Sequence, residues 1–336
     1  MQAIIPVAGA GTRLRPLTYT QPKALISVAG KPILGYIIEN LIENGVTDFV
    51  FVIGYLGEKI REYVEAHYPQ IHASFVTQEE RSGLGHAIYT ARDHVDQGQP
   101  LIIQLGDTIL DADIKTILSF EYSTLCIKKV EDPRAFGVAE LDNDGFIKNL
   151  VEKPNIPKSN MALVGFYFIR DTKALFKALN SIVENNERTN NEFYLTNALQ
   201  HMIADGVRFK SYKVEHWFDV GKKDILLETN GLLLRKNGDE SCEECVKDNN
   251  IFISPYHISK GAKIRNSIIG PYVTIGENSE VSNSMIKNSV IGSFSKLESV
   301  TLQNSLIGSD TTIHGNTQSL NIGDNTEIDL RGEGSK

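Results

Sequence analysis

The hydrophobic positions of this 336-residue chain follow one pattern up to about residue 235 and a different one beyond it. In the first part, short continuous apolar runs at 3–7, 49–53 and 101–105 have the composition of buried parallel strands. Between the first two runs, apolar residues recur at helical spacing from behind Pro32 to near Gly45. Strands alternating with helices predict a Rossmann-like, doubly wound α/β domain over residues 1–235, whose ligands bind at the carboxyl ends of the strands.

The second part of the chain repeats with a shorter period. Residues 236–250 are polar and charged, which predicts a linker. Over residues 251–330, aliphatic residues recur every five or six positions, a period that no α-helix has. A left-handed parallel β-helix turns a corner about every six residues and points one aliphatic side chain inward, so the repeat predicts that fold. The predicted inward residues are Ile258, Ile264, Ile269, Ile275, Val281, Ile286, Ile291, Leu297, Leu302, Ile307 and Ile313.

Composition narrows the range of partners. A net charge of −8 and a pI near 5.6 argue against nucleic acid or an anionic membrane surface as the main partner. No apolar run reaches the roughly 18 residues of a membrane span, and the first residues lack the pattern of a signal peptide. We therefore expect a cytoplasmic protein.

The three cysteines do not form a disulfide framework. Cys242 and Cys245 form a CxxC in the predicted linker, but a zinc site needs four ligands and the chain has no second pair. Exposed thiols or a zinc site shared between subunits both fit this pattern. Cys126 lies in an apolar run and is expected in the core.

A glycine-rich turn with basic residues follows the first predicted strand directly. Residues 9–23 read GAGTRLRPLTYTQPK, so backbone N–H groups and cationic side chains can approach phosphate oxygens. The P-loop pattern is absent, and Leu14 stands where the dinucleotide fingerprint GxGxxG requires glycine. Taken alone, the segment could also be a surface turn with solvated arginines.

Other polar residues stand where candidate ligands would be bound. Asp107 follows the run at 101–105 and Asp219 lies in HWFDVG, and two such carboxylates could hold Mg²⁺ on nucleotide phosphates. A lone aspartate after a strand is, however, more often a turn or cap residue. The Gln78 amide offers both a donor and an acceptor, which match an imide edge but could equally be satisfied within a surface loop. Glu152 and Lys153 could bind sugar hydroxyls and a phosphate, or could be solvated charges at a strand exit.

Taken together, these segments resemble the motifs of the sugar-1-phosphate nucleotidyltransferase family. The glycine turn matches GxGTRLxPLT followed by PK, and Q…GLGxA, GD, EKP and D-x-G segments follow in the family's order. The resemblance covers nearly the whole chain. It implies a mixed-sheet catalytic domain and transfer of a nucleotidyl group from a nucleoside triphosphate to a sugar 1-phosphate with release of pyrophosphate. A β-helical tail this short is expected to mediate oligomerisation or regulation, and we expect a homo-oligomer formed through it.

The resemblance also implies roles for individual residues. Arg13, Lys23, Asp107 and Asp219 would be catalytic, with the two aspartates holding Mg²⁺. The implied nucleotide-binding residues are Ala8, Gly9, Gly11, Thr12, Gln78 and Gly83, and the implied sugar-phosphate-binding residues are Gly137, Glu152, Lys153 and Val164. The sequence departs from the family pattern around Glu192, because Asn190 and Asn191 replace a common Arg-Gly pair and Asn197 replaces an aspartate.

The motifs leave the substrates open. UTP and dTTP both fit, glucose 1-phosphate is the expected sugar, and a mannose-1-phosphate guanylyltransferase is an alternative that Gln78 disfavours. A non-catalytic regulatory subunit would lack the lysine or metal positions, which are present here. An added acyltransferase activity would need a base in the repeat, where only His257 and His314 are available.

Overall fold

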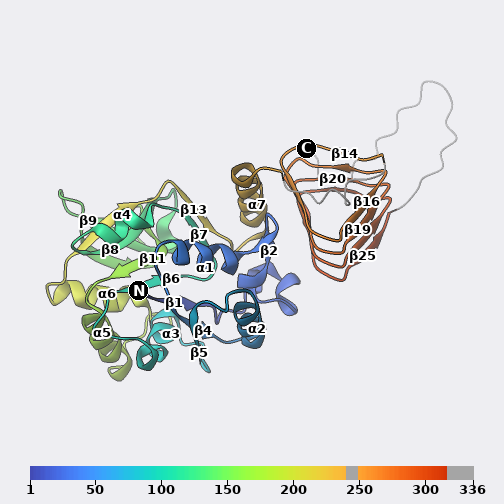
Figure 1. Cartoon of the computed structure of the whole chain (residues 1–336). Coiled ribbons are helices and arrows are strands. Elements are labelled where there is room, and N and C mark those ends of the chain that lie inside the picture. The colour runs from blue at the N-terminus through green and yellow to red at the C-terminus, as the bar shows by residue number, and fades with distance from the viewer. Residues whose placement is uncertain (240–248, 316–336) are drawn as a thin grey trace.

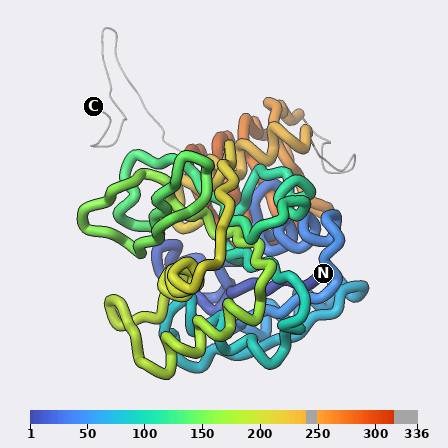
Figure 2. The backbone as a smooth tube through the Cα atoms, turned by 90° about the vertical axis from the view of Figure 1, so that its left-hand side faces the viewer, coloured from blue at the N-terminus to red at the C-terminus, as the bar shows by residue number. Residues whose placement is uncertain are grey.

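In the computed structural model, residues 1–239 and 249–315 are described. They form an α/β domain and a stack of short strands, with helix α7 (Lys223–Asn237) between them (Figure 1). Viewed from the side of the α/β domain, the stacked strands lie behind it (Figure 2). Cys242, Cys245 and the last part of the predicted 251–330 repeat lie outside the described residues.

A nine-stranded mixed sheet forms the centre of the described α/β domain, in the order β5-β4-β1-β6-β11-β8-β12-β10-β9. Strands β5, β4, β1 and β6 are parallel, whereas β11 is antiparallel to both β6 and β8. The three apolar runs of the sequence form β1, β4 and β6, as predicted. The strands of this sheet are β1 (Gln2–Pro6), β4 (Asp48–Ile53), β5 (His72–Thr77), β6 (Leu101–Gln104), β8 (Ser123–Lys129), β9 (Gly137–Leu141), β10 (Phe146–Glu152), β11 (Met161–Ile169) and β12 (Phe209–Lys213).

Helices cover both faces of the sheet because its central strands are apolar on both sides. In β1, Ala3 and Ile5 pack into the core with α1 and α7, while Ile4 packs into the opposite core with α5 and α6. The predicted helix behind Pro32 is α1. The helices are α1 (Ile33–Glu43), α2 (Gly57–His67), α3 (Leu84–Thr90), α4 (Ile114–Ser119), α5 (Thr172–Glu184) and α6 (Leu195–Ala204), with 3₁₀ turns η1 (Thr12–Leu14), η2 (Leu17–Tyr19), η3 (Lys23–Leu25), η4 (Arg92–His94) and η5 (Pro133–Ala135).

Cys126 is fully buried in the first of these cores, as predicted, and burial raises the pKa of its thiol. Two further pairs of strands lie outside the main sheet, namely β2 (Ser27–Val28) with β3 (Lys31–Pro32), and β7 (Thr108–Asp111) with β13 (His216–Asp219). Within the described ranges, no helix combines the length and apolar character that crossing a bilayer requires.

The second domain is a stack of coils built from three parallel sheets. Residues 17 or 16 positions apart pair in register, as Ile258 does with Ile275 and Ile275 with Ile291. Eight of the eleven predicted inward residues are buried in its core, and Leu302, Ile307 and Ile313 are partly buried and pack against it, so the parallel β-helical stack is confirmed. The sheets comprise β14 (Ile251–Phe252), β17 (Ile268–Ile269), β20 (Met285–Lys287) and β23 (Thr301–Gln303); β15 (Tyr256–Ile258), β18 (Val273–Ile275), β21 (Ser289–Ile291) and β24 (Leu306–Ile307); and β16 (Lys263–Arg265), β19 (Glu280–Ser282), β22 (Lys296–Glu298) and β25 (Thr312–His314).

One column of side chains on the β-helix meets the α/β domain. Thr274, Val290 and Leu306 are neighbours in register on β18, β21 and β24. Val290 and Leu306 pack into the core of the α/β domain, and the Thr274 hydroxyl donates to Asn230 Oδ1 at 2.7 Å. Asn230 of α7 is fully buried, and its Oδ1 also accepts from the backbone N–H of Ala29 at 2.8 Å. This asparagine therefore joins the two domains.

Candidate active site

The glycine-rich turn connects β1 to η1 at the carboxyl end of β1. The hydroxyl of buried Thr18 donates to the carbonyl oxygen of Gly11 at 2.8 Å, which fixes the far side of the turn. A Cβ atom placed on Gly9 would meet nothing within 4 Å, so the turn is open on its outer side. Ala8 is buried at the start of the turn and Thr12 is exposed at its end. The turn thus leaves room for a ligand against its backbone.

Lys23 lies between the two predicted metal-binding aspartates. Its Nζ is 2.5 Å from Asp107 Oδ2 and 3.6 Å from Asp219 Oδ1. The Lys23 side chain is 11% exposed, whereas those of Asp107 and Asp219 are 35% and 26% exposed. One buried cation therefore faces two carboxylates that remain open to a ligand.

Strand pairing explains why the two aspartates meet although 112 positions separate them in the sequence. Asp107 follows β6 and directly precedes β7, and β7 pairs antiparallel with β13. In that register Asp219 stands opposite Thr108. The backbone N–H of Val220 also donates to the Asp107 carbonyl at 3.1 Å. This bond continues the pairing of β7 with β13 past Asp219 and holds the two aspartates beside each other.

Arg13 extends from η1 toward Asp219. A Cβ atom on Gly221 would lie 3.0 Å from Arg13 Nη2 and 3.1 Å from Asp219 Oδ1, so the guanidinium and the carboxylate flank this glycine. Burial, followed by the charge of Asp107, raises the pKa of Asp219, and the Lys23 and Arg13 cations oppose that rise. The structure therefore brings the four predicted catalytic residues together.

Asp107, alone among these four residues, lines a small cavity of about 220 Å³. Its lining comes from the end of β1, the segment after β6, η3 and the start of α3, and comprises Pro6, Val7, Ala24, Leu84, Leu105, Gly106 and Asp107. Because the carboxyl ends of parallel strands form one edge of a sheet, β1 and β6 deliver the glycine turn and Asp107 to the same place.

Gln78 and Gly83 lie on the α3 side of this cavity. Gln78 is buried, and its Nε2 donates to the Gly83 carbonyl at 3.1 Å and lies 3.3 Å from His86 Nδ1. Gly83 has φ +98°, and a Cβ atom there would approach the Phe193 carbonyl oxygen to 2.5 Å, so only glycine fits. The amide nitrogen of Gln78 thus holds the loop, while its Oε1 accepts no hydrogen bond from a described residue.

Glu152 and Lys153 meet the start of α6. The Thr196 hydroxyl donates to Glu152 Oε2 at 2.6 Å, and Lys153 Nζ donates to the Tyr194 hydroxyl at 3.1 Å. Burial raises the pKa of Glu152, against the effects of Thr196 and Lys153. A Cβ atom on Gly137 would lie 3.0 Å from Glu152 Oε2, so a glycine is needed for this close approach.

The segment 192–196 links the loop of Gln78 and Gly83 to Glu152 and Lys153. Its Phe193 carbonyl accepts from the Gly85 N–H at 2.7 Å, and its Tyr194 and Thr196 contact Lys153 and Glu152.

Val164 differs from the other predicted site residues. Its side chain is packed in the hydrophobic core, so only its backbone could contact a ligand.

Several residues of the site had no role assigned from the sequence. Thr18, Tyr194 and Thr196 are hydroxyl residues that orient the glycine turn, Lys153 and Glu152 respectively. Trp217, two residues before Asp219, packs against Phe136 with ring centroids 5.0 Å apart, and its buried Nε1–H has no acceptor within the described part of the chain. Such contacts join distant segments and leave no local pattern in the sequence.

The two histidines of the repeat are not placed together. His257 lies at the domain junction, where a Cβ atom on Gly30 would meet its ring at 2.2 Å. His314 is exposed on β25, with Nδ1 3.2 Å from Glu298 Oε2. They lie on different sheets of the stack, and no paired base site is formed between them.

Magnesium is the cofactor that the carboxylates fit. Among the residues that the structure describes, no group of three or more His, Cys, Asp or Glu side chains gathers in metal-binding geometry. A pair of aspartates nonetheless matches Mg²⁺, which usually takes one or two carboxylates and completes its shell with water and substrate phosphates. Asp107 and Asp219 are the pair that could hold it.

An open glycine turn, a buried lysine and two carboxylates at the edge of a mixed sheet define a nucleotide-handling α/β enzyme. Comparisons with known proteins identify its family. The model of the nucleotidyl transferase family matches residues 2–236. The chain therefore belongs to this family, and the resemblance to sugar-1-phosphate nucleotidyltransferases seen in the sequence is confirmed.

Individual relatives extend this match beyond residue 236. The chain is 30% identical over 362 residues to glucose-1-phosphate thymidylyltransferase of Streptomyces antibioticus, covering 98% of this chain and 100% of the relative. It is 36% identical over 317 residues to the bifunctional protein GlmU of Methanocaldococcus jannaschii, covering 87% of this chain and 73% of the relative. The crystal structure of a UDP-glucose pyrophosphorylase complexed with UDP-glucose aligns with a TM-score of 0.61 and 26% identity, over 70% of this chain and 98% of that one.

Proposed function

We propose that this chain transfers a nucleotidyl group from UTP or dTTP to a sugar 1-phosphate, first of all glucose 1-phosphate, and releases pyrophosphate. The observation that carries the proposal is Lys23 held between Asp107 and Asp219 beside an open glycine turn. Relatives named glucose-1-phosphate thymidylyltransferase and UDP-glucose pyrophosphorylase support both the sugar and the pyrimidine.

The reaction joins two anions, so the residues must mainly align them and offset their repulsion. Arg13 and the backbone of residues 9–12 hold the triphosphate and the leaving pyrophosphate. Lys23 stabilises charge near the α-phosphorus, which the phosphate oxygen of the sugar 1-phosphate attacks. Because that oxygen is already ionised near neutral pH, no general base is required. Mg²⁺ bound by Asp107 and Asp219 would supply further positive charge to the phosphates.

Lys153, Glu152 and Gln78 orient the two substrates. Lys153, whose side chain is 40% exposed, orients the attacking phosphate, and Glu152 accepts hydrogen bonds from sugar hydroxyls. Gln78 presents Oε1 to the N3–H of uracil or thymine, since its Nε2 is engaged by Gly83. Cytosine carries no N3–H, so CTP should be a poor substrate.

The test is pyrophosphate release with Mg²⁺ and glucose 1-phosphate, offering UTP, dTTP, CTP, GTP and ATP separately. We expect UTP or dTTP to be used at least about tenfold better than CTP, which corresponds to one lost hydrogen bond to a buried group. A preference for GTP would favour a guanylyltransferase and overturn the assignment of Gln78. Silence with every nucleotide and sugar phosphate would favour a regulatory subunit.

We further propose that the coils of the 251–330 repeat wind left-handedly after a linker at 236–250, that the protein acts in the cytoplasm, and that the β-helix mediates homo-oligomerisation. Exposed Ile251 and Met285, which lie on one sheet of the β-helix, support the last point. Light scattering of the wild type and of Met285→Glu tests it, because a charge in the interface should shift the mass toward the monomer.

A further inference from the structure

His86 lies beside Gln78, and no role follows for it from the proposed reaction. It belongs to the first turn of α3, and its side chain is half-buried. The Gln78 Nε2 atom is 3.1 Å from the Gly83 carbonyl oxygen and 3.3 Å from His86 Nδ1. The two N–H groups of one amide therefore have two partners, and of these partners only the histidine can change its charge.

This contact fixes the tautomer of the imidazole. An amide nitrogen only donates, so His86 Nδ1 accepts and the proton of the neutral ring is on Nε2. The ring stacks on that of Phe193, with centroids 6.2 Å apart and an interplanar angle of 25°. Phe193 is buried, and its carbonyl accepts from the N–H of Gly85, the residue before His86, at 2.7 Å. The fold thus holds the acceptor in place through its ring and through its backbone.

Burial and two charged side chains set the protonation of His86. Burial lowers the pKa of the imidazole, the charge of Glu80 raises it, and the charge of Arg188 lowers it. The guanidinium carbon of Arg188 lies 4.5 Å from the centroid of the Phe193 ring, on which the imidazole also stacks. The resulting pKa lies below the ordinary value, so the ring is neutral near neutral pH and able to accept from Gln78.

The orientation of the Gln78 amide decides which base it matches. While Nε2 is engaged by Gly83 and His86, Oε1 is the atom open to a ligand, and an acceptor matches the N3–H of uracil or thymine. A protonated imidazole carries a proton on Nδ1, which repels the amide N–H, and a half-turn of the amide would relieve the repulsion. The rotated amide presents a donor instead, which matches the unprotonated N3 of cytosine.

We propose that neutral His86 is a positioning residue for base selection: by accepting from Gln78 Nε2 it keeps Oε1 directed at the base, so that uracil or thymine is preferred to cytosine. His86 acts through Gln78 and does not touch the base. This role rests on the proposed function, in which Gln78 recognises the base, and it names the group that fixes the amide.

The test measures a preference rather than a rate. We take kcat/KM with UTP or dTTP, whichever is used better, and divide it by kcat/KM with CTP, so that effects common to all nucleotides cancel. His86→Phe keeps an aromatic ring against Phe193 but has no acceptor, and should reduce this ratio from about tenfold or more to below about threefold. His86→Asn supplies Oδ1 as an acceptor that does not titrate, and should restore the ratio.

The pH dependence of the ratio is a second readout. In the wild type the ratio should fall as the pH drops through the lowered pKa of His86, because the protonated ring no longer accepts. Arg188→Gln removes a cation that lowers this pKa, so the fall should move to higher pH. His86→Asn should show no such fall. An unchanged ratio in His86→Phe, or the same fall in His86→Asn as in the wild type, would overturn the proposal.

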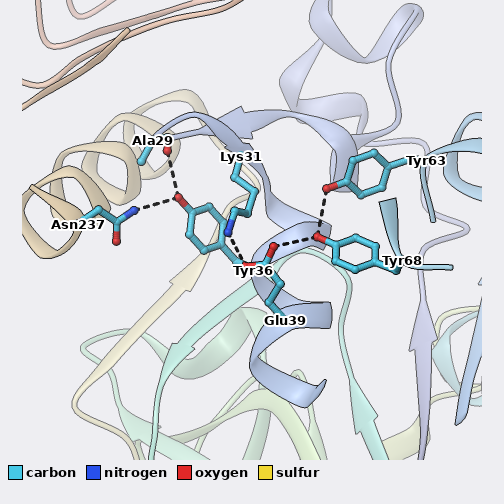
Figure 3. Close-up of polar contacts among 7 residues, drawn as sticks. All are labelled: Ala29, Lys31, Tyr36, Glu39, Tyr63, Tyr68 and Asn237. Carbon is cyan, nitrogen blue, oxygen red and sulfur yellow. Dashed lines mark hydrogen bonds and ion pairs between the residues drawn. The ribbon is translucent and has the colours of Figure 1, made fainter. Parts of the chain in front are cut away.

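A matched control comes from a separate hydrogen-bonded network around α1 and α2, made by Lys31, Glu39, Tyr63 and Tyr68 (Figure 3). The Tyr68 hydroxyl donates to Glu39 Oε1 at 3.1 Å, and none of these bonds involves His86. Tyr68→Phe therefore removes a part-buried hydrogen bond, as His86→Phe does, and should leave the ratio and its pH dependence unchanged. An equal drop in the ratio in both variants would overturn the specific role of His86.

Calorimetric binding of UTP, dTTP and CTP without a sugar phosphate separates this role from the proposed function. Pyrophosphate release with a ratio that does not depend on His86 would keep the function and overturn only the positioning role. A chain that releases no pyrophosphate, but whose preference for UTP or dTTP in binding depends on His86, would keep the role and overturn the function. A chain that binds none of the three nucleotides would overturn both.

Discussion

The cleft of the α/β domain, formed around Lys23, Asp107 and Asp219, and the interior of the β-helix differ in the side chains that they bring together. The cleft gathers one lysine, one arginine and two aspartates, contributed by segments up to 206 positions apart. The interior of the β-helix contains aliphatic side chains brought into register from residues 16 or 17 positions apart. Charge that is held in place by tertiary structure can act on a substrate, whereas a periodic apolar column stabilises only its own stack. From this difference we infer that the α/β domain carries the catalytic residues and that the β-helix has a structural role.

The largest expected effect comes from removing the cation at the centre of the cleft. Lys23→Ala should lower kcat by roughly 10² or more, the scale of losing one preorganised group that stabilises transition-state charge. Steady-state pyrophosphate release measures it, with exposed Lys173→Ala as the control. A loss below about threefold would remove Lys23 from the mechanism.

Inside the β-helix, we expect a substitution to lower stability and to leave kcat nearly unchanged. Ile291→Ala should lower the free energy of unfolding by about 2–5 kcal/mol, because it opens a cavity in the aliphatic column, and should leave kcat of the folded protein nearly unchanged. Lys260→Ala, at an exposed side chain in a turn of the β-helix, should change stability by less than about 0.5 kcal/mol. Chemical denaturation gives both values. If Ile291→Ala lowered kcat as much as Lys23→Ala, the division of roles would fail.

The junction between the domains should respond less strongly. Asn230→Ala leaves the buried N–H of Ala29 and the hydroxyl of Thr274 without their acceptor, which should cost about 1–3 kcal/mol of unfolding free energy. Asn237→Ala at the exposed end of α7 is the control and should have little effect. Equal stability of the two variants would show that Asn230 does not hold the domains together.

The smallest effect is a change in pH dependence. The pKa of Asp219 lies above its usual value, and turnover that needs the ionised carboxylate should fall as the pH drops through this raised pKa. Since the Arg13 cation lowers the pKa of Asp219, Arg13→Gln should move the acid limb of the kcat profile to higher pH. Arg61→Gln on α2 should not move it. A limb that stays in place or moves to lower pH in Arg13→Gln would contradict this electrostatic coupling.

Much of the fold could be predicted because it is encoded locally. The inward column of the β-helix follows from a repeat visible in the sequence, and strands β1, β4 and β6 follow from runs that are apolar on both faces. The meeting of Asp107 with Asp219 follows only from the register of β7 with β13, so the resemblance to a family, rather than periodicity, pointed to that pair.

The features that were missed depend on single long-range contacts. Asn230 lies in a helix whose pattern does not distinguish it, yet it joins Ala29 to Thr274. Tyr194 and Thr196 belong to a segment that departs from the family pattern nearby, and their contacts with Lys153 and Glu152 require the packing of α6 against β10.

The most direct test of the central claim is to identify the product. The chain is incubated with Mg²⁺, glucose 1-phosphate and either UTP or dTTP, and both pyrophosphate and any nucleotide sugar are quantified by mass spectrometry. The account predicts that one nucleotide sugar forms for each pyrophosphate released, and that Lys23→Ala reduces both together. Pyrophosphate without a nucleotide sugar, or equal product from the wild type and Lys23→Ala, would contradict it.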